Sequence, residues 1–491
     1  MSRPTRPLVR RTPYVLLPDP ARVVTKIFLP GQELAASARS RSTAVLDRVL
    51  ALSDQAVSES LAAAMASFGP RHHDLATTLE SHFDLVAHRL DDPQAVSAER
   101  RQLIGAYFSM EYAIEAAALF NPSMVAHPDQ SGLAPGATRF VMSVRAVGEG
   151  HHSSVEFRTG TMSADDVITF DEPSQHTVLP QPVSPTYSRA VFEQQHAELG
   201  GNLSSADFVL EALTPSFTRA DLDLALAGLR DQRLTRGSAA RATDRVEWIA
   251  ACNYSIEFPA GSALGDRVIL PRSPSESRGI EDVRLVRFTD ADGAVDYRGT
   301  YTAYDGDRVV PQLIRTGDFR TFHLSQLSGP AAKNKGLALF PRLVGGELLA
   351  LSRWDRESNA LARSADLSHW EVLADLQVPS HPWEIVQVGN CGSPLETEAG
   401  WLVLTHGVGP MREYSIGAML LDLDDPRQVI GQLARPLLTP SAEERDGYVP
   451  NVVYSCGGLL HGDTLVLPYG CSDASIRVAL IDVPGLLAEL G

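Results

Sequence analysis

Short β-rich runs dominate the sequence after residue 120 and constrain its fold more than any other feature. Typical runs are RFVMSVRAV, YRGTYTAY, GWLVLTHGV and DTLVLPYG, and Gly, Pro, Asp and Asn residues separate them. Runs of this length, rich in β-branched and aromatic residues between turn residues, are typical of strands. We therefore expect residues 120–491 to form one all-β unit.

A turn signature recurs within this unit. TGDFRTFHL contains Asp318, and SADLSHWEVL contains Asp366, 48 residues further along the chain. A recurrence of roughly 40–50 residues with one turn signature indicates stacked four-stranded blades, because each blade buries its faces only against its neighbours. The spacing therefore predicts a β-propeller, and a β-sandwich with similar hairpin turns stays open as the alternative.

Two segments have helical periodicity instead. Residues from about Ser42 to Phe120 repeat apolar residues at spacings of three and four with few Gly or Pro, which predicts helices. A second helical pattern, from about Ser204 to Leu234, begins with cap-like Ser and Asp residues. We expect an N-terminal arm and helical region over residues 1–119, and a helical insertion in the β unit at about residues 187–245.

The charge balance of the 491-residue chain narrows its partners. Lys and Arg total 43 against 60 for Asp and Glu, a net charge of −17, which argues against nucleic acid and anionic membranes as partners. The basic start is followed by no apolar stretch of signal-peptide length, and no run approaches the roughly 20 apolar residues of a membrane span. We expect a cytoplasmic protein.

The sequence also lacks the motifs of common cofactors. Its four cysteines are dispersed and never spaced as C-x-x-C, so neither a zinc site nor a disulfide framework is predicted. No glycine-rich phosphate loop precedes a helix, and no His/Glu pair has metal-ligand spacing. We expect no nucleotide cofactor and no metal.

In a propeller, polar residues at the ends of the inner strands of different blades meet in a central funnel. The residues gathered in this way are rich in Arg, Asn, Asp and Tyr, a set that suits a hydroxyl-dense ligand such as a sugar. They are Asn121, Arg145, Asp282, Arg284, Lys335, Arg353, Asn390, His406, Tyr414, Tyr448, Asn451 and Asp473.

One stretch, SESRGIEDVRLVRF, places Glu281, Asp282 and Arg284 at the mouth of a predicted strand. Two adjacent carboxylates beside arginines are either a solvated strand end or a place where a proton is moved. The stretch alone favours the solvated end.

Several ordered motifs resemble those of glycoside hydrolase family 130. They are GIEDVRLVRF, NKGLALFPRLVGGELLALSR, GNCGSPLETEAGWLVLTHGVG, YSIGAMLLDLDDP and YVPNVVYSCGGLLHGDTLVLPYGCSD. The match runs from Gly279 to Val478, and FNPSMV with VMSVRAV resembles the first blade. The resemblance implies a five-bladed β-propeller that phosphorolyses, or in some branches hydrolyses, β-mannosides with inversion. The two helical segments lie outside the family pattern.

The resemblance also implies roles for Asp282 and for the residues next to it. Asp282 matches the family's general acid, which delivers its proton through a hydroxyl of the mannosyl ring, and Val283 stands where the family usually has Pro. Arg284 would hold the geometry of the site. We expect Glu281 to raise the proton affinity of Asp282 by like-charge repulsion.

Phosphate requires converging cations, and the resemblance places Lys335 and Arg353 on two of the family's basic positions. Gln387 stands where a third, a lysine, is expected, and His406 matches a position that approaches phosphate and would partly compensate. Loss of basic residues also marks the hydrolytic branches, in which a carboxylate activates water. Glu384 is the candidate base for that reaction, although a structural role is favoured for it.

The resemblance also implies sugar-binding roles for Asn121, Arg145, Tyr414 and Asp473. We expect an enzyme that acts on a small mannoside or an oligosaccharide, most often by phosphorolysis with inorganic phosphate as co-substrate. An inverting hydrolase is the second hypothesis, and a non-catalytic carbohydrate-binding propeller is the third. The linkage, the leaving sugar, the role of the helical segments and a homo-oligomeric state stay open.

Overall fold

The computed structural model describes residues 7–31, 40–200, 204–230 and 236–491. The chain divides into two compact units. One, the β unit, comprises Met1–Pro18, Ala117–Pro173 and Pro180–Gly491, and the other, the N-terminal unit, comprises Asp19–Ala116 and Ser174–Leu179. No helix among the described residues is both long and apolar enough to cross a membrane.

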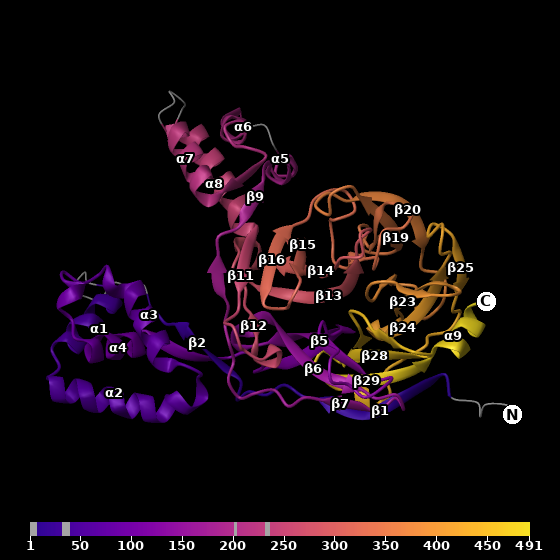
Figure 1. The fold of residues 1–491 in the computed structure, drawn as a ribbon, viewed down its shortest axis with the longest axis horizontal. Coiled ribbons are helices and arrows are strands. Elements are labelled where there is room, and N and C mark those ends of the chain that lie inside the picture. The colour runs from indigo at the N-terminus through magenta and orange to yellow at the C-terminus, as the bar shows by residue number, and fades with distance from the viewer. Residues whose placement is uncertain (1–6, 32–39, 201–203, 231–235) are drawn as a thin grey trace. The chain divides into compact units, whose positions relative to one another are not determined.

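The β unit contains five antiparallel groups of four strands, called sheets 1 to 5, which surround a common centre in Figure 1. Sheets 1 and 2 consist of β4 (Ala118–Ala126), β5 (Thr138–Val147), β6 (Ser153–Met162) and β7 (Ile168–Phe170), and of β13 (Gly279–Thr289), β14 (Val295–Tyr304), β15 (Val309–Thr316) and β16 (Thr321–Gln326). Sheets 3 and 4 consist of β17 (Ala338–Leu339), β18 (Leu348–Ser352), β19 (Asn359–Ser364) and β20 (Glu371–Gln377), and of β21 (Gln387–Asn390), β23 (Gly400–Val408), β24 (Tyr414–Leu421) and β25 (Val429–Gln432). Sheet 5 consists of β26 (Val453–Tyr454), β28 (Thr464–Cys471), β29 (Ser475–Asp482) and β1 (Val9–Leu16).

Short strands extend these sheets. Sheets 1 and 2 are joined by one parallel bridge between Ser153 and Gly279. The additional strands are β8 (Gln181–Val183), β11 (Tyr254–Glu257), β12 (Val268–Ile269), β22 (Leu395–Thr397) and β27 (Leu459–His461). The C-terminal helix α9 (Val483–Leu490) packs its buried Leu486 and Leu490 into the core that sheets 4 and 5 share.

The first strands of all five sheets converge. A cavity of about 320 Å³ is lined by residues of β4 and β13 and by the segments that follow β17, β21 and β26. A parallel bridge between Ser123 and Gly457 joins the first strand of sheet 1 to the segment that follows the first strand of sheet 5. The N-terminal strand β1 pairs with β29, so the two ends of the chain meet in sheet 5.

The recurring turn signature has a common geometry. The carboxylate of Asp318 accepts the backbone N–H of Arg320 and Thr321, and that of Asp366 accepts those of Ser368 and His369. Each turn joins the third strand of its sheet to the fourth. Asp422 makes the same turn in sheet 4, a third copy that the sequence comparison missed.

The N-terminal unit contains the predicted helices, α1 (Arg41–Leu50), α2 (Asp54–Phe68), α3 (Leu75–Ala87) and α4 (Ala98–Tyr107). Gly105 allows α4 to approach α3 closely, because a Cβ there would lie 1.9 Å from the carbonyl oxygen of Leu79. The expectation that helix continues to Phe120 is wrong. Strand β3 (Ser109–Ala113) pairs with β2 (Val23–Ile27), and β4 begins at Ala118, because long-range strand pairing overrides local periodicity there.

The helical insertion lies between β8 and β11. It consists of α5 (Arg189–Glu198), α6 (Ser204–Glu211), α7 (Arg219–Arg230), α8 (Arg236–Cys252) and the hairpin β9 (Thr186–Ser188) and β10 (Ser216–Thr218). Its helices extend past the predicted end at residue 245, and β10 interrupts the helix predicted over residues 204–234, of which residues 231–234 lie outside the described residues. Tyr187, Phe192 and Phe217 form its aromatic core.

Candidate functional site

A bulge near the start of β13 brings Glu281 and Asp282 to one side of the strand. The pairing with β14 shifts between Glu281 and Arg284, and Asp282 has a left-handed backbone with φ of 57°. Adjacent residues of a regular strand point to opposite faces, so the bulge is what lets one partner contact both carboxylates. Both side chains are nearly buried, which excludes the solvated strand end.

Arg145, at the end of β5, is that partner. Its Nη2 lies 2.6 Å from Oε1 of Glu281, and its Nη1 lies 3.3 Å from Oδ1 of Asp282. The guanidinium also packs over the ring of Phe120, 4.9 Å from its centroid. A nearly buried arginine thus fixes both carboxylates.

Asn121 contacts the same carboxylate from the first strand of sheet 1. A bulge between Phe120 and Ser123 gives Asn121 a φ of 48°, and its Nδ2 donates to Oδ1 of Asp282 at 2.8 Å. The first strands of two sheets therefore use a matching bulge to aim polar groups at one point.

Arg284 is fully buried and ties three sheets together beneath Asp282. It donates to the backbone oxygens of Cys391 and Asp282, at 3.2 and 3.0 Å, and to the hydroxyl of Tyr454 at 2.7 Å. These contacts give Arg284 a role in holding the geometry of the site. Tyr454 therefore belongs to the site, although it was not among the candidates predicted from the sequence.

The electrostatics at Asp282 differ from the sequence expectation. Burial acts to raise its pKa, but the charges of Arg145, Lys335 and Arg284 and the hydrogen bond from Asn121 lower that pKa to about 2. The proton affinity of Asp282 is therefore lowered, whereas the sequence led us to expect that Glu281 would raise it. The physical reason is that Arg145 and Lys335 both pair with the Glu281 carboxylate and offset its charge.

Asp473 holds the second carboxylate of the region. It lies in the turn between β28 and β29, with a left-handed φ of 50°. Burial, together with the charge of Asp282, raises the pKa of Asp473 to about 6, and Arg145, Arg412 and Lys335 oppose the rise. Two neighbouring carboxylates thus differ strongly in proton affinity.

The candidate phosphate-binding cations lie beside this cluster. Lys335, in the segment before β17, forms an ion pair with Oε2 of Glu281. The neighbouring Asn334 donates to the backbone oxygen of Arg353 at 3.1 Å, and a Cβ at Gly336 would lie 2.9 Å from the Arg353 side chain. The segment that carries Lys335 is therefore held against Arg353.

His406, on β23, adjoins Arg353. A Cβ at Gly389 would lie 2.3 Å from Nε of Arg353 and 2.6 Å from Cε1 of His406. Burial and the charges of Arg353 and Arg284 hold the pKa of His406 well below its usual value. His406 can therefore compensate for the missing lysine only as a neutral hydrogen-bond donor, because a neutral imidazole adds no charge. Tyr414 stacks on the His406 ring at 6.1 Å.

Several buried polar atoms of this cluster have no hydrogen-bond partner among the described residues. They are Oδ1 of Asn121, Nε of Arg145, Nε of Arg353, Oδ1 of Asn390 and both ring nitrogens of His406. Buried polar groups are normally paired, so a group of unpaired ones marks a place where a polar ligand can complete the bonding.

Glu384, the candidate base, has a different environment. Its Oε1 accepts from the backbone N–H and hydroxyl of Ser380 and from the backbone N–H of His381, at 3.1 to 3.2 Å, and contacts Nδ1 of His381 at 2.9 Å. A Cβ at Gly407 would meet the Glu384 side chain, so Glu384 packs on the face of β23 opposite to that of His406. The contacts show that it caps the loop before β21.

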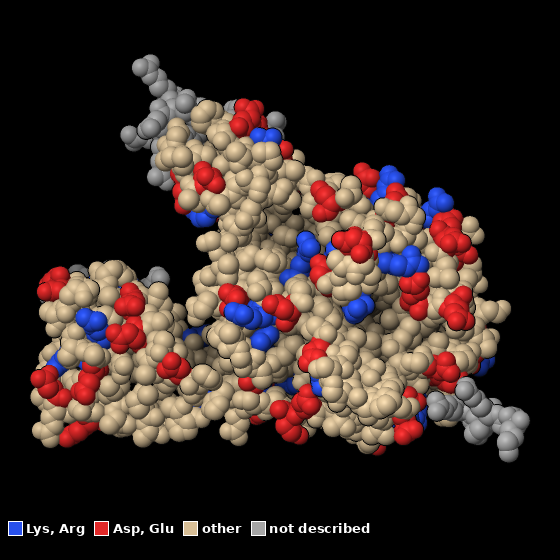
Figure 2. All heavy atoms as spheres, in the orientation of Figure 1, with Lys and Arg blue, Asp and Glu red and all other residues tan. Residues whose placement is uncertain are grey.

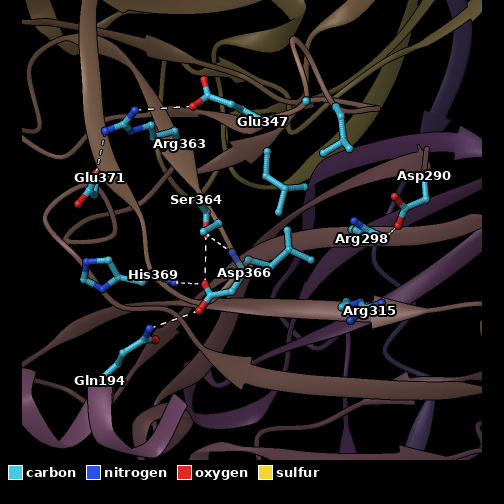
Figure 3. A pocket seen from close by; sticks show the side chains of 15 residues that line it. Gln194, Asp290, Arg298, Arg315, Glu347, Arg363, Ser364, Asp366, His369 and Glu371 are labelled. Carbon is cyan, nitrogen blue, oxygen red and sulfur yellow. Dashed lines mark hydrogen bonds and ion pairs between the residues drawn. The ribbon is translucent and has the colours of Figure 1, made fainter. Parts of the chain in front are cut away.

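A larger groove of about 950 Å³ lies along sheets 2 and 3 and the insertion. Arg363 pairs with Glu347 and Glu371 there, and Arg298 pairs with Asp290 (Figure 3). These charges offset one another, and acidic and basic side chains are likewise interspersed over the face shown in Figure 2. The candidate site is thus distinguished by unpaired buried groups rather than by cavity size.

Comparison with known proteins gives the family. Residues 261–489 match the model of glycoside hydrolase family 130, described as beta-1,4-mannooligosaccharide phosphorylase. A 1,2-beta-oligomannan phosphorylase of Thermoanaerobacter sp. is 33% identical over 230 residues, which are 45% of this chain and 74% of that protein. A beta-1,2-mannobiose phosphorylase of Listeria innocua is 31% identical over 229 residues, 45% of this chain and 63% of that protein. The chain belongs to glycoside hydrolase family 130.

Solved structures show a looser likeness. The beta-1,2-mannobiose complex of the Listeria innocua beta-1,2-mannobiose phosphorylase has a TM-score of 0.42 at 20% identity, and the likeness covers 77% of this chain and 93% of that one. A structure titled for family 130 glycoside hydrolases that target beta-1,2 mannosidic linkages in Candida mannan has a TM-score of 0.43 at 16% identity, with 75% and 86% covered.

Proposed function

We propose that the chain is a five-bladed β-propeller enzyme that cleaves β-mannosidic bonds with inversion by phosphorolysis, and so releases mannose 1-phosphate. Inorganic phosphate is the co-substrate, and no other cofactor is required. The site is formed by Asp282 as the acid, by the phosphate-binding set Lys335, Arg353 and His406, and by the sugar-binding set Asn121, Arg145, Arg284, Tyr414 and Asp473.

The arrangement of strands supports the propeller. Each of the five sheets has four antiparallel strands, and their first strands or the segments that follow them line one cavity. The pairing of β1 with β29 supplies the last sheet with its fourth strand from the start of the chain. We infer a catalytic domain over residues 120–491 that also recruits β1, and a separate N-terminal arm and helical region before it.

The single observation that best supports this reaction is a chain of contacts that joins the proposed acid to the proposed phosphate-binding cations. Glu281 contacts Arg145, which holds Asp282, and it contacts Lys335, whose neighbour Asn334 donates to the backbone oxygen of Arg353. Phosphate at Lys335 and Arg353 would attack the anomeric carbon of a mannoside. The bond from that carbon to the leaving oxygen breaks, and Asp282 supplies the proton to that oxygen through a hydroxyl of the ring.

The names of the relatives support a mannoside as substrate, since they include phosphorylases of β-1,2- and β-1,4-linked mannosides. The four cysteines are buried and free, which supports the reducing environment of the cytoplasm.

Hydrolysis is the second candidate because Gln387 carries no charge where a third cation is expected. The hydrogen bonds of Glu384 within its own loop argue against its use as the base in that reaction. A non-catalytic propeller is disfavoured, because sugar binding alone does not call for an acid beside a cationic group.

A panel of β-mannosides incubated with and without phosphate tests the proposal. Phosphate-dependent release of mannose 1-phosphate is the expected result, and Asp282→Asn should slow it by about 10²–10⁴-fold, the usual range for an acid catalyst. Unchanged turnover by Asp282→Asn would refute the role of Asp282. No turnover on any β-mannoside, with ligand affinity unaffected by Asp282→Asn, would indicate the binding protein.

A further inference from the structure

Glu281 is placed between the two halves of the candidate site. Its Oε1 lies 2.6 Å from Arg145, and its Oε2 pairs with Lys335, so both oxygens of one nearly buried carboxylate are used. Arg145 also contacts Asp282, whereas the segment that carries Lys335 is held against Arg353 by Asn334. One residue therefore connects the proposed acid to the proposed phosphate-binding group.

We propose that Glu281 is a positioning residue that couples the arrival of phosphate to the protonation of Asp282. Phosphate withdraws the Lys335 ammonium from Glu281, and the Glu281 carboxylate, no longer offset, then favours the protonated form of its neighbour. The inference rests on the proposed function, since it requires an anion at Lys335.

Lys335 is the partner that can move. Its side chain is 38% exposed, against 18% for that of Arg145, and a lysine ends in a compact charge on a flexible stem. Arg145 has two carboxylate partners and an aromatic ring beneath it, whereas Glu281 is the one ion-pair partner of Lys335 among the described residues. A dianion beside Arg353 would offer Lys335 a stronger counter-charge than one carboxylate.

The charged and titratable groups that face Asp282 come from four of the five sheets. They are Arg145 from β5, Glu281 and Arg284 from β13, Lys335 before β17, Asp473 after β28, and Tyr454 and Cys456 at β26. The cations around Asp282 outweigh the effect of its burial and lower its pKa to about 2. An acid with that pKa has no proton to give, so catalysis requires a change in this balance.

Withdrawal of Lys335 supplies that change. It lessens the positive charge at Asp282 and leaves Glu281, which is adjacent in sequence, as an additional negative neighbour. Asp282 then takes a proton from solvent and gives it to the leaving oxygen during the reaction. The phosphate that becomes bound to the sugar releases its own proton afterwards, so protons balance over the cycle.

Calorimetry with sulfate tests the coupling, because sulfate is a tetrahedral dianion that does not titrate near neutral pH. Titration of the full chain in two buffers of different ionisation enthalpy gives the number of protons taken up on binding. We expect the wild type to take up more protons near pH 6 than Glu281→Gln or Asp282→Asn, in which the neighbouring Asp473, with a pKa of about 6, still responds to the anion. Glu281→Gln should also bind sulfate at least about threefold more tightly, because an anion that competes for Lys335 is gone.

If Glu281 has a purely structural role, Glu281→Gln should bind sulfate more weakly and should take up as many protons per bound sulfate as the wild type. That result would overturn the inference. Glu371→Gln, which breaks an exposed pair with Arg363, is the matched control and should behave as the wild type. If Glu281→Gln fails to fold by circular dichroism, Lys335→Gln replaces it. That variant should bind sulfate more weakly and take up fewer protons than the wild type, because its Glu281 is already without Lys335.

The outcomes separate the inference from the proposed function. Phosphate-dependent release of mannose 1-phosphate with equal proton uptake in the wild type and Glu281→Gln would refute only the coupling. Failure of the wild type to bind either sulfate or phosphate would refute both.

Discussion

The side-chain amide of Asn121 donates a 2.8 Å hydrogen bond to the carboxylate of Asp282, although 161 residues separate the two in sequence. Each residue sits at a bulge with a left-handed backbone, so the two bulges together set the position of the acid. Asn121→Gly keeps that backbone accessible and removes the bond. We expect the free energy of unfolding to fall by about 1.5–3 kcal/mol, the usual contribution of a hydrogen bond to a charged group, as measured by urea denaturation.

Asn451→Gly is the matched control for that variant. Asn451 has a similar φ of 63°, and its side chain makes no hydrogen bond to a charged group in the described part of the chain. Equal losses of stability in the two variants would contradict the importance of the Asn121 contact.

The raised pKa of Asp473 predicts that this residue lowers the stability of the protein at high pH. Its pKa is about 6 when folded against an ordinary 3.8, so the folded state binds the proton more tightly than the unfolded state. Stability from this group is thus fully present below about pH 4 and is lost as the pH rises through about 6. Asp473→Asn should raise the melting temperature at pH 8 and change it little at pH 4. A larger gain at pH 4 would contradict the assigned pKa.

Glu384 is predicted to matter for stability rather than for the activation of water. Glu384→Ala leaves partly buried hydrogen-bond donors of Ser380 and His381 without their acceptor, and should lower the free energy of unfolding by about 1–3 kcal/mol. Alanine at the exposed Glu398 should change stability by less than about 0.5 kcal/mol. Unchanged stability of Glu384→Ala, together with loss of mannoside cleavage, would instead identify a catalytic base.

Gln387 offers a gain-of-function test. It lies two residues before Gly389 on β21, hence on the same face, which contacts Arg353 and His406. Gln387→Lys adds a cation on that side, so the KM for phosphate should fall by about threefold to tenfold. Steady-state kinetics at varied phosphate measure this. An unchanged or higher KM for phosphate would contradict a position of residue 387 beside the phosphate.

Local pattern predicted the strand-rich character, the helical N-terminal region and two of the recurring Asp turns, because each depends on neighbours in sequence. It failed where distant segments decide the structure. β3 forms because β2 pairs with it, and β1 joins β29 from the opposite end of the chain. Pairing between such remote segments leaves no periodic signal in either of them.

The candidate site shows the same limit. Motifs predicted which residues to collect, and the structure brings Asn121, Arg145, Asp282 and Lys335 into one bonded group. They did not predict the charge balance, since the low pKa of Asp282 results from cations contributed by other sheets. Tyr454 was missed because a buried tyrosine in a strand is indistinguishable from core until its hydroxyl is seen on Arg284.

The choice of nucleophile is the central claim, and phosphorus NMR of the wild-type protein with β-1,2-mannobiose and inorganic phosphate tests it most directly. We predict a new phosphomonoester signal of α-mannose 1-phosphate, the inverted product, that grows with phosphate concentration and is absent with Asp282→Asn. Release of free mannose at a rate independent of phosphate, without that signal, would contradict the account.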